Sequence, residues 1–173
     1  MDDRQLRRRC EARLKELALP IPFDIHAFCE TISEQRGRPI VLHAVPGAAG
    51  ACGVWVPVPS ADLIFYEEHT SPLHQEHIIL HEISHLMCNH HPVPVSEHEI
   101  SQLLFPDVHP ETVKLVLQRG GYATEEEREA ELLASLILER GSSGSHGRRS
   151  GTGQDRVLNR LEASLDASNR EVS

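Results

Sequence analysis

The segment between Ser71 and Pro92 is the strongest constraint on how this chain folds. Ser71 followed by Pro72 is typical of a helix start, with serine as the cap and proline in the first turn. Pro92 and Pro94 cannot continue a helix, so the helix ends by about His90. Apolar residues recur between these limits with the spacing of one helix face: Ile79, Ile83, Leu86 and Met87. We therefore expect a helix with one face packed into a core.

The same helix carries the sequence HEISH at residues 81–85, which matches the pattern HExxH. His81 and His85 project from one helix face because they are four residues apart, so both imidazoles reach one ion. Glu82 lies about 100 degrees around the helix, where a carboxylate acts as a general base toward water beside that ion. A catalytic zinc ion needs a third protein ligand and a fourth position left open. The glutamate-rich stretch 125–131 is the obvious donor of that ligand.

Two further stretches accompany this motif. Residues 63–66 (LIFY) predict a short strand before the helix, and residues 127–134 (EREAELLA) lie on a later helix and are followed by Ile137 and Leu138. Together with HEISH, they resemble the ImmA/IrrE family of bacterial metallopeptidases. The resemblance implies that His81, His85 and Glu127 bind one zinc ion and that Glu82 is the catalytic base. Glu131 stands where the family has Asn or Asp, and its expected role is to orient a ligand histidine.

Other polar side chains near the motif are candidate neighbours of the site. His77 lies one turn before His81, and we expect it at the edge of the cleft. Tyr66 and Tyr122 are candidate hydrogen-bond donors to a transition state. Four more histidines are expected to be exposed to solvent and not to be ligands: His90, His91, His98 and His109.

The sequence leaves alternatives open for each proposed ligand. His81 and His85 would also fit a solvent-facing pair, and Thr124 with Glu127 would also fit a capping box. A shift of register would replace Glu127 by Glu126 or Glu131. A rival His/Cys site would use a stripe along one helix face: His77, His81, His85 and Cys88.

The arrangement of helical and strand patterns predicts an α+β fold. Helices are expected up to Pro20 and from Asp24 to Gly37, and strands at 40–45, 53–58 and 62–66. We expect a small antiparallel sheet packed against the HExxH helix and the Glu127 helix, zincin-like if the resemblance holds. The strand at 63–66, if it forms a sheet edge, would pair with an extended substrate.

The chain divides into four predicted parts. An N-terminal helix occupies 1–22, and a zinc metallopeptidase-like domain occupies 23–140, its last helix running from Thr124 to about Arg140. Residues 141–154 (GSSGSHGRRSGTGQ) have almost nothing to bury and predict a flexible linker. A short helix with an apolar stripe follows at 155–173.

The composition narrows the class of protein. A hydrophobic content of 39% over 173 residues is enough for one core. The net charge of -9, concentrated in the middle of the chain, disfavours direct binding of nucleic acid. No apolar run approaches a membrane span and the first residues lack the apolar stretch of a signal peptide, so we expect a cytoplasmic protein without a membrane partner. The cysteines form no CxxC pair, which predicts reduced thiols.

The sequence therefore predicts a zinc-dependent endopeptidase. The resemblance implies that its substrate is a regulatory protein, such as a helix-turn-helix transcriptional repressor. The alternative is a zinc-stabilised regulatory or toxin-system module that binds partners without cutting them, and a metal-free helical scaffold is a third interpretation. Two histidines and a carboxylate also suit Fe(II), Mn or Co, but a base at Glu82 favours zinc.

Overall fold

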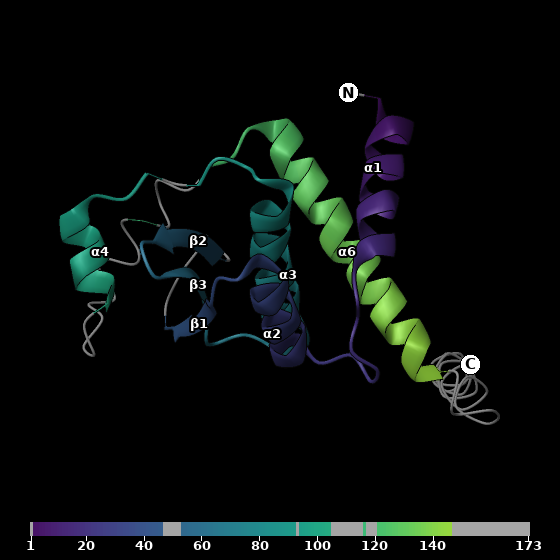
Figure 1. Ribbon diagram of the computed structural model, residues 1–173, viewed down its shortest axis with the longest axis horizontal. Helices are drawn as coiled ribbons and strands as arrows, with labels where there is room; N and C mark the ends of the chain where they lie inside the picture. The colour runs from purple at the N-terminus through teal and green to yellow at the C-terminus, as the bar shows by residue number, and fades with distance from the viewer. Residues whose placement is uncertain (1, 47–52, 93, 105–115, 117–120, 147–173) are drawn as a thin grey trace, which may run out of the picture.

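The computed structural model describes residues 2–46, 53–92, 94–104, 116 and 121–146 (Figure 1). The structure is α+β, with a three-stranded sheet and helices around it. In chain order its elements are α1 (Asp3–Glu16), α2 (Ile25–Arg36), β1 (Ile40–Val45), β2 (Gly53–Val58), β3 (Ala61–Glu67), α3 (Pro72–Cys88), α4 (Glu97–Leu104) and α6 (Thr124–His146). None of the helices in the described ranges is long and apolar enough to cross a membrane.

The ends of α2 and α3 follow the signals in the sequence. The Asp24 side chain accepts a hydrogen bond from the amide of Ala27, and Gly37 ends α2 with a left-handed φ of 63°. Ser71 caps the start of α3 in the same way. Asn89 ends α3 with a φ of 56°, a conformation that asparagine tolerates better than most residues. These predicted helix limits are confirmed to within two residues.

Helix α6 is longer than predicted. It runs to His146 and not to about Arg140, so the first residues of the predicted linker are helical. Gly141, the first residue of the predicted linker, is buried, and an added Cβ would lie 2.7 Å from the Phe23 ring. The small residue lets α6 continue past Phe23. The rest of the predicted linker and the predicted helix at 155–173 lie outside the described residues.

The sheet has the strand order β1-β3-β2. Strands β2 and β3 are antiparallel as predicted, but β1 pairs with β3 in parallel, so the expected all-antiparallel sheet is wrong. Pro57 of β2 has no N–H to donate, which suits an edge strand, whereas β3 is buried along most of its length and takes the centre. The predicted pairing of residues 63–66 with a substrate is therefore also wrong, because β3 has a neighbour on each side.

A buried carboxylate fixes the β2–β3 hairpin. Asp62 is 1% exposed and accepts hydrogen bonds of 3.0 Å from the indole nitrogen of Trp55 and from Nε of Arg38. The Arg38 guanidinium also donates to the backbone carbonyls of Val58 and Ala61. Asp62 and Arg38 therefore link the two strands of this hairpin on either side of its turn.

The strands bury side chains on both faces of the sheet. Leu63 and Phe65 of β3 join one apolar cluster, and Ile64 and Tyr66 join or border the other, as the alternation of a strand requires. Helix α3 packs on β2 and β3, and α6 packs on the far side of α3 together with α1 (Figure 1). The prediction that the Glu127-bearing helix packs on the sheet is corrected, since α3 forms the layer next to the strands.

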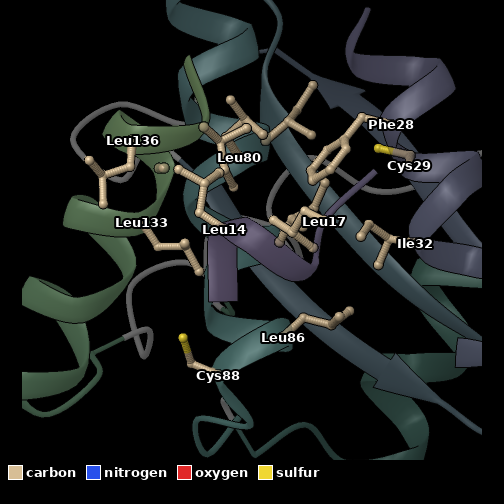
Figure 2. Packing of buried hydrophobic residues seen from close by; sticks show 14 of the residues in the cluster. Leu14, Leu17, Phe28, Cys29, Ile32, Leu80, Leu86, Cys88, Leu133 and Leu136 are labelled. Carbon is tan, nitrogen blue, oxygen red and sulfur yellow. The ribbon is translucent and has the colours of Figure 1, made fainter. Parts of the chain in front are cut away.

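Four helices contribute to the main core. Figure 2 shows the side chains that meet there: Leu14 and Leu17 from α1 and the residue after it, Phe28 and Ile32 from α2, Leu80 and Leu86 from α3, and Leu133 and Leu136 from α6. Helix α1, in the part predicted as an N-terminal helix at residues 1–22, contributes Cys10 and Leu14 to the same hydrophobic core. The N-terminal helix is therefore part of the structure that supports α3 and α6.

Candidate metal centre

Three potential metal ligands converge where α3 meets α6. Nε2 of His81 lies 3.0 Å from Nε2 of His85 and 3.3 Å from Oε2 of Glu127, and the third side of this triangle is 3.9 Å. A tetrahedral zinc ion with bonds near 2.0 Å holds its nitrogen and oxygen ligands about 3.3 Å apart. The three atoms therefore have the spacing of one face of a zinc tetrahedron.

The two candidate ligand histidines have different surroundings. His85 is fully buried, and burial, followed by the charges of His81 and His90, lowers its pKa to about 3. Its imidazole is thus neutral. The other ring nitrogen of His81, Nδ1, lies 3.4 Å from the Glu131 carboxylate, which only accepts hydrogen bonds. Nδ1 of His81 thus has a carboxylate partner of its own, and Nε2 lies on the side of His85 and Glu127.

Two glutamates at the start of α6 have different roles: one caps the helix and the other lies beside the histidines. Glu126 accepts a hydrogen bond of 3.1 Å from the amide of Ala123 and so caps the helix. Glu127 points toward the histidines. Glu131 lies one turn later, 3.2 Å from Nε2 of His77 as well as beside His81. The capping role considered for Glu127 belongs to Glu126.

Glu82 is buried between α3 and the edge strand β2. It is 4% exposed, and its Oε2 accepts a 3.0 Å hydrogen bond from the backbone amide of Trp55. Burial raises the pKa of Glu82 to about 8, with a smaller contribution from the charge of Glu127. A bound divalent cation would oppose this shift. A carboxyl group with a raised pKa is suited to taking up a proton near neutral pH.

Tyr122 covers the centre from the segment before α6. Its ring stacks on His85 with a centroid distance of 3.4 Å and an interplanar angle of 19°. Its hydroxyl is buried and has no hydrogen-bond partner among the described residues. Burial, and then the charges of Glu82 and Glu127, raise its pKa, so the hydroxyl keeps its proton. An unpaired buried donor beside two carboxylates is available for a ligand oxygen.

Tyr66 and the exposed histidines are not brought to this centre by any described contact. Tyr66 lines a separate hollow between α2 and β1. His91 and His98 are exposed as predicted, and His109 lies outside the described residues. The rival His/Cys site is not formed among the described residues, because Cys88 groups with His90 and Glu129. Cys10, Cys29 and Cys88 are free and buried.

The exposure predicted for His90 is wrong. His90 is 7% exposed, and its Nδ1 lies 2.9 Å from Nδ1 of His85. The left-handed conformation of Asn89 turns the chain back, and the His90 amide donates to the carbonyl of His85 in a Schellman motif. The sequence held one signal for the burial of His90. Asn89, four residues after His85, is a residue that often ends a helix, and the turn it makes brings the next residue back toward His85.

A hollow of about 640 Å³ opens beside the ligands on the side of α1 and α6. His81, Glu127 and Glu131 form one wall, and Leu6 and Leu132 give it an apolar part. The side chains of His81 and Glu127 are 21% and 42% exposed, whereas His85 is inaccessible. A molecule in solution therefore reaches the centre past His81 and Glu127.

No family model matches this chain, and the comparisons found neither a curated protein nor a solved structure with significant similarity to it.

Proposed function

We propose that this protein is a zinc-dependent peptidase with His81, His85 and Glu127 as the metal ligands and Glu82 as the general base. The convergence of Nε2 of His81, Nε2 of His85 and Oε2 of Glu127 carries the proposal, because their separations of 3.0, 3.3 and 3.9 Å fit one zinc ion. Three protein ligands leave a fourth position open, as in catalytic and not structural zinc sites.

Zinc bound here supplies a Lewis acid that polarises a carbonyl group and makes water a better nucleophile. Glu82 takes the proton that the attacking water loses and passes it to the leaving amine. Its hydrogen bond from Trp55 holds one carboxylate oxygen in place while the other stays available. The unpaired hydroxyl of Tyr122 donates to the oxygen that gains negative charge in the transition state.

The hollow between α1 and α6 is the proposed substrate site. Its wall combines an apolar part, at Leu6 and Leu132, with charged groups from both helices. The outer edge of β2 contributes little to binding an extended peptide, because the Trp55 amide already donates to Glu82 and Pro57 has no N–H. We expect a protein substrate, and the resemblance to ImmA/IrrE peptidases suggests a helix-turn-helix regulator.

The second candidate is a metal-stabilised interaction module that uses the same ligands without hydrolysis. Metal content does not separate it from a peptidase, because both hold the ion. Glu82 separates them, since only a peptidase needs a base at this position.

The Glu82→Gln variant tests the proposal. Glutamine keeps the side-chain volume and an oxygen for the Trp55 amide but takes up no proton. Cleavage of a candidate regulator, followed by mass spectrometry, should fall by about a hundred- to ten-thousand-fold, while the metal content stays that of the wild type. If Glu82→Gln cleaved the candidate regulator as fast as the wild type, or replaced the wild type fully in the cell, the peptidase mechanism would be contradicted. The second of these results, without any cleavage, would support the interaction module.

A further inference from the structure

The nitrogen of His85 that faces away from the proposed metal has a partner of its own. Nδ1 of His85 lies 2.9 Å from Nδ1 of His90, inside the protein. Two imidazole nitrogens this close share one proton, so one of them donates and the other accepts. Which one donates decides where His85 presents its lone pair.

The contact between His90 and Glu129 favours one assignment. Nε2 of His90 lies 3.5 Å from Oε2 of Glu129, and both side chains are 6% exposed. A carboxylate only accepts hydrogen bonds, so a neutral His90 carries its proton on Nε2 and has a lone pair on Nδ1. His85 must then hold its own proton on Nδ1. Its Nε2 is left as the acceptor atom that faces His81 and Glu127.

Glu129 is in turn held from α1. Nη2 of Arg9 lies 3.0 and 3.1 Å from the two carboxylate oxygens, and Nε of Arg13 lies 4.0 Å from one of them. These guanidinium groups compensate a buried negative charge that would otherwise be costly. They hold the Glu129 carboxylate on the side of His90.

His90 and Glu129 also form, together with Cys88, a second group of side chains that could hold a metal ion. A second metal ion there would have to approach a carboxylate already paired with Arg9, next to a second cation at Arg13. The charges therefore favour a supporting role over a second metal site.

We propose that His90, oriented by Glu129 and Arg9, positions His85 for metal binding by fixing its proton on Nδ1. This inference rests on the metal centre of the proposed function. His90 is a positioning residue in it and contacts neither the metal nor the substrate. In this arrangement helix α1 supports the metal centre through Arg9, which precedes its partner Glu129 by 120 residues in the chain.

The test is the zinc affinity of full-length variants, measured by competition with a chromogenic chelator. His90→Leu removes the acceptor at similar size, and His90→Asn places an oxygen near the former Nδ1. The matched control is His91→Leu at the neighbouring residue, whose side chain is 98% exposed. Loss of such a partner typically weakens metal affinity 10- to 100-fold. We expect this loss for His90→Leu, a smaller loss for His90→Asn and none for His91→Leu.

Cobalt(II) absorption spectra of the same proteins provide a second readout, because they report ligand geometry without requiring activity. His90→Leu should alter the spectrum, and thermal unfolding of the metal-free variants checks that each one folds. Equal zinc affinity and an unchanged spectrum in folded His90→Leu would overturn the inference and leave the metal centre intact. Two ions in the wild type and one in His90→Leu would also overturn it, by making His90 a ligand. A wild type without metal would overturn the proposed function together with the inference.

Discussion

The backbone amide of Trp55 donates a 3.0 Å hydrogen bond to Oε2 of Glu82. This bond joins the edge strand β2 to helix α3 at the residue beside the proposed ligands. It is possible because Gly53 lets the strand approach closely: an added Cβ would lie 2.6 Å from Cγ2 of Ile78 and 3.1 Å from Oε1 of Glu82. The contact between strand and helix therefore depends on a residue without a side chain.

The Gly53→Ala substitution should destabilise the protein and disturb Glu82. The new methyl group overlaps Ile78, so β2 or α3 must shift, at a cost of about 1–3 kcal/mol. The free energy of unfolding, measured with a chemical denaturant, should fall by this amount, and peptidase activity should fall more steeply than zinc content. Gly121→Ala is the matched control, because a Cβ there meets nothing within 4 Å. Equal stability of the two variants would contradict the close approach of β2 and α3.

The Tyr122→Phe substitution separates catalysis from stability. The hydroxyl has no hydrogen-bond partner in the described part of the chain, so its removal should leave the unfolding temperature unchanged or slightly raised. The ring still stacks on His85, and zinc affinity should stay the same. If the hydroxyl donates to the transition state, kcat should fall about 100- to 1,000-fold. An unchanged kcat would remove Tyr122 from the proposed machinery.

The thiol of Cys29 should be unreactive in the folded protein. Burial raises the pKa of Cys29 to about 12, and the side chain is 4% exposed. Because the thiolate is the reactive form, alkylation of Cys29 should be slow at pH 8 and should accelerate as the pH rises toward 12. Peptide mapping after iodoacetamide treatment checks this, with denatured protein as the fast-reacting reference. Rapid labelling of Cys29 in the folded protein at pH 8 would contradict its burial.

The sequence predicted those helix ends that are set by capping residues next to them in the chain. Ser71-Pro72, Asp24 and Gly37 act through the few residues around them, so the corresponding helix ends were predictable. The spacing of His81 and His85 is equally local, because one helix turn brings them together. Their approach to Glu127 needed the packing of α3 on α6. The resemblance of the later stretch pointed to Glu127, which the structure places beside both histidines.

Features that depend on long-range packing were missed. Pro57 carried a signal for an edge strand, but the parallel pairing of β1 with β3 depends on the path of the intervening chain. Residues 141–154 predicted a linker because they have little to bury, yet Gly141 packs closely against Phe23 and α6 continues past it. The burial of His90 follows from a turn at Asn89 and from Glu129, distant in sequence. In each case a residue's role is set by a neighbour that no local pattern identifies.

Metal content by elemental analysis tests the central claim most directly. Wild type, His81→Ala, Glu127→Ala and Glu82→Gln are purified without added metal and measured together. We predict about one zinc ion per chain in the wild type and in Glu82→Gln, and loss of the metal in the two ligand variants. A wild type that holds no metal, or ligand variants that keep it, would contradict a zinc centre at His81, His85 and Glu127.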